Sequence, residues 1–81
     1  MLGENHMQFC EAIKKLRQHV LLSQDAFGKE LGVTFATVNR WETGKTLPNY
    51  RALKQIEQLC KKNNISFEEI RESITNQEGD L

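Results

Sequence analysis

The stretch SQDAFGKELGVTFATVNRWETG, residues 23–44, decides how this chain folds. Its apolar residues have a spacing that suits two short helices with one shared buried face, and they are Phe27, Leu31, Val33, Val38 and Trp41. Gly32 interrupts the pattern, because glycine adopts the positive φ that ends a helix, and Thr34 is a natural N-cap for a second helix. The stretch therefore predicts a helix capped by Ser23, a short turn, and a second helix over about 35–42.

The second of these helices is expected to have one buried side and one outward side. Val38 and Trp41 are expected to face inward. The residues expected to face outward are Phe35, Ala36, Thr37, Asn39 and Arg40. Small residues in the preceding helix, Ala26 and Gly28, let the two backbones approach closely. Such a helix is suited to insertion into a binding partner.

The rest of the chain predicts three more helices around this pair. One runs from about Met7 to His19, a fourth starts after the N-cap Asn49, and a fifth opens with a capping box between Ser66 and Glu69. The fifth helix is expected to extend through about residue 75. No segment has the sustained alternation of a strand, so the fold class is all-α, a compact five-helix bundle. Residues 1–6 and 76–81 are expected to be flexible ends of a single domain over 7–75.

The composition is that of a soluble globular protein, with 38% hydrophobic and 27% charged residues among 81. No apolar run reaches membrane-spanning length and no secretion signal is evident, so the expected location is the cytoplasm. Cys10 and Cys60 lie far apart, and His6 and His19 do not join them at a metal-ligand spacing. We therefore expect two free thiols rather than a disulfide, and neither a metal nor a cofactor.

The formal net charge is zero, but the charges are unevenly distributed along the chain. Between Ala12 and Ile56 eight cationic residues stand against three acidic ones, a balance of +5, whereas the balance from Glu57 onward is −3. A basic middle produces a local positive field that favours a polyanionic partner. Taken alone, the same asymmetry is also compatible with charges scattered over a solvated surface.

The segment from Ile13 to Ile65 resembles the helix-turn-helix domains of the phage Cro and repressor proteins, also called the Xre family. The motifs that carry the resemblance are Leu16-Arg17, Ser23-Gln24, Gly28, Gly32-Val33-Thr34, Trp41-Glu42-Thr43-Gly44 and Pro48. The resemblance implies the five-helix fold of phage-repressor type, whose third helix binds the major groove of double-stranded DNA. It also implies a homodimer on paired half-sites.

The resemblance assigns base contacts to the outward residues of the helix over 35–42. Arg40 matches a position from which two hydrogen bonds can reach guanine, and Asn39 one that can serve adenine. Phe35 and Ala36 depart from the usual polar residues, and they would pack on thymine methyl groups. The alternatives for Phe35 are that its ring turns inward or contacts a partner protein.

Other positions match contacts to the phosphate backbone or within the domain. Gln24 would contact a phosphate or brace the third helix, and Thr34 would direct its hydroxyl at the DNA backbone. Lys45 and Thr46 would contact phosphates from the loop that follows, with Lys14, Lys29 and Arg51 as weaker candidates. Arg17 and Glu42 match an ion pair that fixes the angle of the third helix and leaves a guanidinium edge for a phosphate; otherwise they form a surface pair of little consequence.

The resulting function hypothesis is a DNA-binding transcriptional regulator without catalytic activity, a repressor or controller that associates with the nucleoid when bound. The alternative is an antitoxin or another protein-interaction module, in which a toxin partner binds the apolar stripe Phe67, Ile70 and Ile74. The same stripe would serve as a dimer interface, or it would close the domain's own core. We expect no enzyme, because no paired carboxylates, catalytic triad or glycine-rich phosphate loop occurs.

Overall fold

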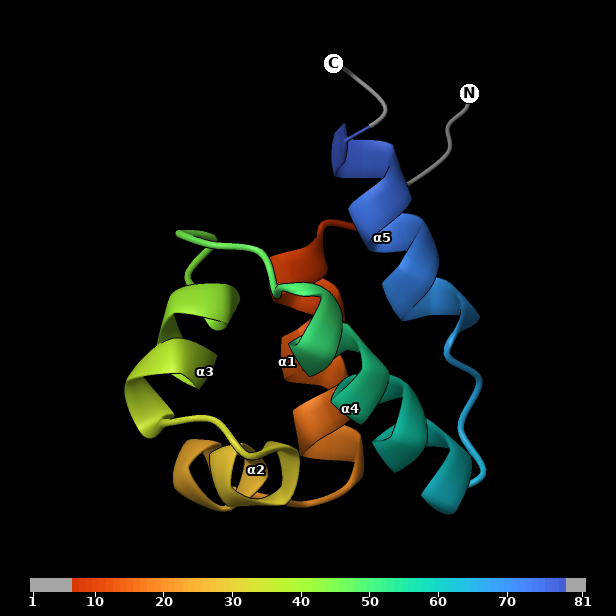
Figure 1. The fold of residues 1–81 in the computed structure, drawn as a ribbon. Helices are drawn as coiled ribbons and strands as arrows, with labels where there is room; N and C mark the ends of the chain where they lie inside the picture. Colours follow the sequence, from red (N-terminus) through yellow and green to blue (C-terminus); the bar gives the residue numbers. More distant parts are fainter. Residues whose placement is uncertain (1–6, 79–81) are drawn as a thin grey trace.

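The computed structural model describes residues 7–78, with side chains described through Thr75. The five helices are α1 (Phe9–His19), α2 (Gln24–Leu31), α3 (Phe35–Glu42), α4 (Tyr50–Lys62) and α5 (Glu68–Glu78) (Figure 1). No β-strand occurs within that range, so the predicted all-α, five-helix fold is confirmed. The expected flexible segment 1–6 and the last three residues of the expected tail lie outside the described residues.

Two helix boundaries differ from the prediction. α1 begins at Phe9 rather than Met7, because the Glu11 carboxylate accepts the backbone N–H of Gln8, 3.3 Å away, and makes Gln8 the N-cap. At the other end of the chain, α5 continues to Glu78, beyond the boundary expected at residue 75.

The predicted capping box at the start of α5 is replaced by a tighter turn. The Ser66 hydroxyl accepts the N–H of Glu68, at 3.2 Å, and the Phe67 carbonyl accepts the N–H of Arg71, at 3.0 Å. Phe67, not Ser66, is therefore the residue that directly precedes α5 and accepts its first backbone hydrogen bond. The Glu69 carboxylate, which the box would have used, lies 3.4 Å from Lys15 Nζ of α1.

Both helices of the 23–44 stretch end at a glycine in the left-handed conformation. Gly32 has φ 75° and Gly44 has φ 80°. The residue after each glycine bonds back into the helix, from Val33 N to the Gly28 carbonyl and from Lys45 N to the Arg40 carbonyl, each at 2.9 Å. Each of these hydrogen bonds joins residues five positions apart and satisfies a carbonyl group that the end of a helix would otherwise leave without a partner.

Gly28 lies where the turn before α3 passes close to α2. A Cβ at this position would lie 2.7 Å from the Val33 carbonyl oxygen, closer than real Cβ contacts allow. The expected need for a small residue is therefore real, but the neighbouring backbone is that of the turn before α3. The absence of a side chain lets the turn fold tightly over α2.

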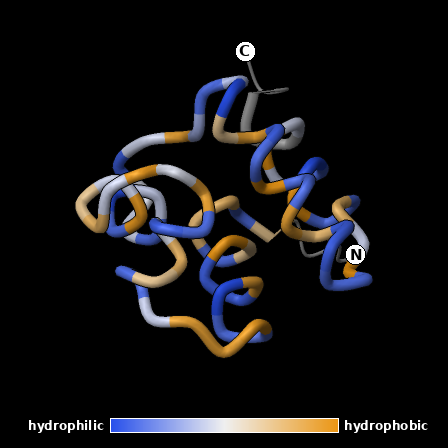
Figure 2. The backbone as a smooth tube through the Cα atoms, turned by 60° about the horizontal axis from the view of Figure 1, so that its bottom comes forward, coloured by the Kyte–Doolittle hydropathy of each residue, from blue (hydrophilic) through white to orange (hydrophobic). Residues whose placement is uncertain are grey.

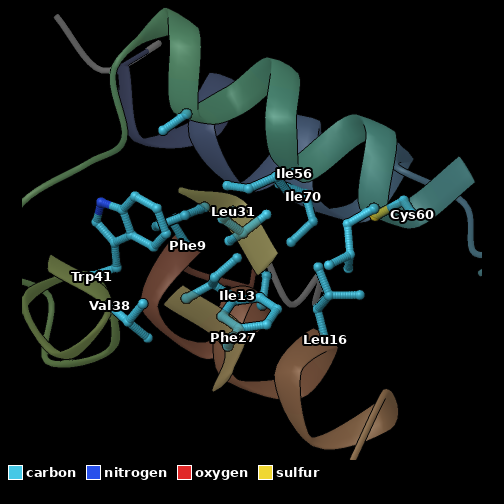
Figure 3. Close-up of a cluster of buried hydrophobic side chains, with 13 residues drawn as sticks. Phe9, Ile13, Leu16, Phe27, Leu31, Val38, Trp41, Ile56, Cys60 and Ile70 are labelled. Carbon is cyan, nitrogen blue, oxygen red and sulfur yellow. The ribbon is translucent and has the colours of Figure 1, made fainter. Parts of the chain in front are cut away.

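One hydrophobic core joins the helices, and α3 contributes its inner side to it (Figure 3). Trp41 is 2% exposed and meets the ring of Phe9 from α1 edge-on, with centroids 6.1 Å apart and planes at 79°. Val38 is fully buried beside Phe27 and Ile13 (Figure 3). Hydrophobic and hydrophilic residues alternate along each helix, so that each contributes one side (Figure 2). The burial of Trp41 and Val38 fixes which side of α3 faces away.

Candidate nucleic-acid interface

α3 forms one side of the molecule, at the left of Figure 1. Ala36, Asn39 and Arg40 are exposed, and Thr37 is half-buried. Phe35, at the first position of the helix, keeps 52% of its surface exposed, so the alternative in which its ring turns inward is wrong. The outward row thus combines an aromatic ring, a methyl group, a hydroxyl, an amide and a guanidinium.

An ion pair between α1 and α3 holds the helix from behind. Arg17 Nε lies 2.7 Å from Glu42 Oε2, and Arg17 Nη2 lies 3.1 Å from Glu42 Oε1. The side chains are only 14% and 4% exposed. The hydrogen bond to Glu42 raises the pKa of the Arg17 guanidinium despite its desolvation, so the pair stays charged.

The same guanidinium also ties down the turn between α1 and α2. Arg17 Nη1 donates to the carbonyl oxygen of Leu22 at 3.0 Å. Contacts within the protein therefore involve all three guanidinium nitrogens and use three of the five N–H groups. The geometry fits a bracing function for Arg17 better than a surface pair of little consequence.

Gln24, the first residue of α2, connects the ion pair to the outward row. Its amide nitrogen lies 3.0 Å from Glu42 Oε1 and 3.4 Å from Asn39 Oδ1. Of the two functions expected for this side chain, bracing of the third helix is the one its contacts serve. Its backbone N–H, in the first turn of α2, remains suited to an anion.

The start of α3 is closed by two threonine hydroxyls. Thr34 Oγ1 accepts the N–H of Thr37 at 3.1 Å, and the two hydroxyl oxygens lie 2.9 Å apart. One hydroxyl donates to the other, so one hydroxyl hydrogen remains available to an outside acceptor. This N-cap orients α3 and keeps one donor at the edge of its outward face.

The charges around α3 are predominantly positive and unpaired. Among the described side chains, the ion pairs leave out Arg40, Lys45 and Arg51, whereas Lys29 lies 3.5 Å from Asp25. Lys45 and Thr46 are exposed in the loop directly after α3. The one carboxylate of α3, Glu42, is neutralised by its partner. A polyanion beside this face would meet the unpaired cations Arg40 and Lys45.

Two features near this face escaped the sequence analysis. Leu22 contributes its backbone carbonyl, which carries no signal in a side-chain pattern. Leu21 lies in the left-handed region at φ 60° and is 89% exposed. The residue type gives no signal for this conformation. Only the position of Leu21 could have indicated it, because the chain must reverse its direction directly after α1.

A second surface feature lies between α4 and α5, away from the α3 row. A groove of about 330 Å³ is lined by Tyr50, Leu53, Lys54, Glu57, Phe67, Arg71, Ile74 and Thr75. Of the predicted apolar stripe, Ile70 is 3% exposed and belongs to the core, whereas Phe67 and Ile74 are only partly buried. Tyr50, which sequence reasoning did not single out, is 76% exposed, with Lys54 Nζ 5.7 Å from its ring centre.

The remaining expectations concern cysteines, metals and membranes. Both cysteines are free, Cys60 buried in the core and Cys10 half-buried. Within the described part of the chain, no three His, Cys, Asp or Glu residues lie together as metal ligands would. None of the described helices combines the length and the apolar character that a membrane crossing requires.

Comparison with known proteins agrees with the helix, turn and helix formed by α2 and α3. The family model described as helix-turn-helix matches residues 13–70. The HTH-type transcriptional activator BcrR of Enterococcus faecalis is 36% identical over 50 residues, which make up 62% of this chain and 24% of that protein. The chain thus spans about a quarter of the length of this curated relative. No solved structure gives a significant match.

Proposed function

The chain belongs to the helix-turn-helix family, of the Cro and repressor type, and from this premise we propose that it is a sequence-specific DNA-binding transcriptional regulator. The observation that carries the proposal is the division of α3 into two sides. Val38 and Trp41 hold the inner side in the core, and the ion pair to α1 holds its end. The outer side, from Phe35 to Arg40, is left exposed on a rigid support, as insertion into a major groove requires.

In this proposal the outward row of α3 contacts base edges. Arg40 donates two hydrogen bonds to the O6 and N7 atoms of a guanine. Phe35 and Ala36 have no donor or acceptor in their side chains, so their contacts are with thymine methyl groups. These three contacts specify sequence, because base edges rather than phosphates differ between sites.

Phosphate contacts position the domain on the duplex. Lys45 and Thr46 contribute from the loop after α3, and Thr34 contributes its hydroxyl at the other end of the helix. The backbone N–H of Gln24, at the start of α2, gives a fourth contact. Contacts on both sides of α3 would fix its depth in the groove.

The proposed protein regulates transcription by occupying its site rather than by catalysis, as a repressor or controller in the cytoplasm, associated with the nucleoid when bound. The relative BcrR is named a transcriptional activator. A second copy would dock through the groove between α4 and α5, giving a homodimer on two half-sites.

One observation favours a second candidate function, an antitoxin or other protein-interaction module. Tyr50, Phe67 and Ile74 expose apolar surface at the same groove, which a toxin partner would cover in place of a second copy. Sedimentation of the purified protein distinguishes the two. A concentration-dependent dimer supports self-association, whereas a monomer at all concentrations supports a different partner.

The salt dependence of DNA binding tests the proposed function. With roughly four to six phosphate contacts per subunit, log K for a duplex selected from a random pool should fall by about four to five per log unit of salt for each subunit that is bound. The affinity is measured by fluorescence anisotropy between low and moderate salt. An affinity that barely changes over this range would exclude the mechanism.

A further inference from the structure

Phe35 gives the start of α3 an apolar surface that the protein itself leaves uncovered. Its ring keeps 52% of its surface exposed at the first position of the helix. Among the described residues, the hydrophobic side chains that pack on the core do not include it. Ala36, the next residue, is exposed as well. Burial of an aromatic ring is favourable, so the start of α3 favours a partner that offers an apolar group at this point.

The major groove offers one apolar substituent among its hydrogen-bond donors and acceptors, which is the C5 methyl group of thymine. The side chains of Phe35 and Ala36 have no donor and no acceptor, so they cannot bond to the O4 atom beside that methyl group. 5-Methylcytosine carries the same methyl group on the same C5 atom, with an amino group where thymine has O4. A contact that is made to the methyl group alone therefore fits both bases.

The hydroxyl groups beside Phe35 do not separate the two bases either. Thr34 Oγ1 accepts the backbone N–H of Thr37, and the two hydroxyl oxygens lie 2.9 Å apart. Whichever hydroxyl donates to the other, the pair keeps one hydrogen and at least one lone pair for an outside group. The hydrogen suits the O4 atom of thymine, and the lone pair suits the N4 amino group of 5-methylcytosine.

We propose that α3 binds 5-methylcytosine in place of thymine, with Phe35 and Ala36 as the contacts to the C5 methyl group. The inference rests on the proposed function, since it concerns which bases the outward row of α3 accepts. An unmethylated cytosine at this position lacks the apolar group, and transfer of a methyl group to its C5 atom supplies it. The affinity of the protein for such a site would thus depend on cytosine methylation as well as on sequence.

Arg40 makes a cytosine next to a guanine the best candidate for such a site. Arg40 follows Ala36 by four residues, so the two side chains are neighbours on the helix, with Cβ atoms about 5–6 Å apart. This separation is less than two base-pair steps of about 3.4 Å. Arg40 is exposed, and none of the ion pairs among the described side chains includes it. A methylated cytosine beside a guanine therefore presents the methyl group and the acceptors O6 and N7 within reach of one side of α3.

The experiment first locates the base pair that Phe35 contacts. Bound duplexes are selected from a random pool by the wild type and by Phe35→Ala, and the position at which the variant loses a preference for thymine is the one below Phe35. Synthetic duplexes then carry thymine or uracil opposite adenine there, or 5-methylcytosine or cytosine opposite guanine. Within each of these two comparisons the bases differ by the methyl group alone. Fluorescence anisotropy should show that the methyl group raises the affinity of the wild type by about two- to fivefold in both, as burial of one methyl group does.

Three variants assign this effect to the ring. Phe35→Ala should bring both affinity ratios close to one, with at most the small contribution of Ala36 left. Phe35→Leu keeps an apolar side chain and should retain part of both ratios. Leu21→Ala is the control, because it removes an apolar side chain that is 89% exposed on the turn between α1 and α2, and it should keep the wild-type ratios. The ratios are compared within each variant, so a general change in affinity does not alter them.

The outcomes separate this inference from the proposed function. If the wild type enriches no sequence, the proposed function itself fails. If it enriches a sequence but no position loses a preference for thymine in Phe35→Ala, the inference is overturned and the function stands. The inference is also overturned if methylation of cytosine leaves the affinity unchanged or lowers it. If Phe35→Ala keeps both ratios, the methyl group acts through the DNA itself rather than through the ring, which overturns the inference as well.

Discussion

Arg17 and Glu42 form a two-point ion pair that joins the last turn of α1 to the last residue of α3, with nitrogen–oxygen distances of 2.7 and 3.1 Å. Since Trp41 beside it is in the core, the pair and the ring together leave α3 little freedom to tilt. The orientation of the outward row is therefore a property of the free protein. The first prediction concerns the energetic weight of this pair.

Arg17→Met should lower the free energy of unfolding by roughly 2–4 kcal/mol, because it leaves the Glu42 carboxylate buried without its partner. The measurement is urea unfolding followed by circular dichroism. Arg71→Met is the matched control, since Arg71 pairs with Glu68 at 2.6 Å but both side chains are more than half exposed. The control should cost less than about 1 kcal/mol. Equal losses in the two variants would contradict the bracing function of Arg17.

The left-handed conformation of Leu21 predicts a stabilising substitution. A leucine at φ 60° is strained, and at 89% exposure its side chain gains little from packing. Leu21→Gly should raise the free energy of unfolding by roughly 0.5–1 kcal/mol, the strain relieved less the added entropy of the unfolded chain. Leu22→Gly, which removes a partly buried side chain packed on the core, should destabilise instead. A loss of stability in both would contradict the strain argument.

Replacement of Gly28 or of Gly32 by alanine should lower the free energy of unfolding, for a different physical reason at each position. At Gly28 the added Cβ would meet the Val33 carbonyl at 2.7 Å, so Gly28→Ala should cost about 1–3 kcal/mol, as overpacking does. Thr34 directly follows Val33, so the start of α3 should shift as well. Thermal unfolding gives the energy, and the NMR signal of the Thr34 amide reports the shift.

At Gly32 the space is open, and the cost comes from the backbone alone. Gly32→Ala places a side chain at φ 75°, which should cost about 1–2 kcal/mol without moving the turn. The two variants thus differ in their effect on Thr34 rather than in the sign of the stability change. A displaced Thr34 signal in Gly32→Ala would show that the backbone, and not a clash, sets the turn.

Cys60 predicts a loss of stability in alkali. Burial, with a further contribution from the negative charge of Glu57, raises the pKa of the Cys60 thiol above its ordinary value of 9.0. Because the folded pKa is the higher one, the stabilisation is complete below pH 9 and is lost as the pH rises through the folded pKa. The slope reaches at most about 1.4 kcal/mol per pH unit, that of one proton. Urea unfolding of the wild type and of Cys60→Ala between pH 7 and 10 measures it, and parallel curves would refute this contribution.

Arg40 and Lys45 predict two distinct kinds of binding defect. Arg40→Ala should lower the affinity for the selected duplex by about 1–3 kcal/mol and relax the preference at one base pair. Lys45→Ala should weaken binding about equally on all sequences and reduce the salt slope by about one. Anisotropy titrations on the selected duplex and its single-base variants measure both. A uniform loss for Arg40→Ala would reassign that side chain to a phosphate.

The sequence was sufficient for the parts of the fold that depend on periodicity and on special residues. Gly32 and Gly44 mark the two helix ends because a positive φ favours glycine, and Val38 and Trp41 mark the inner side of α3 by their spacing. Leu21 shows the limit of such signals. Its conformation is imposed by the chain reversal after α1, and nothing in its residue type announces it.

The candidate site also has some features that the sequence predicts and others that it does not. The exposure of Phe35 and Asn39 followed from helical geometry. The hydrogen bonds from Gln24 could not be predicted in this way. The orientation of its amide depends on the charged Glu42, which only the fold brings next to Gln24. Likewise, whether Ile70 belonged to the core or to an interface was decided by how α5 packs on α1, a long-range contact that no local pattern contains.

The central claim is that the outward side of α3 is the surface that meets DNA. Its most direct test is a ¹H–¹⁵N NMR titration of the labelled protein with the selected duplex, which maps the residues whose signals change on binding. The account predicts the largest changes at residues 34–40 and at Lys45, with small changes in the groove between α4 and α5. Changes centred on Phe67 and Ile74, with the α3 signals unmoved, would contradict it.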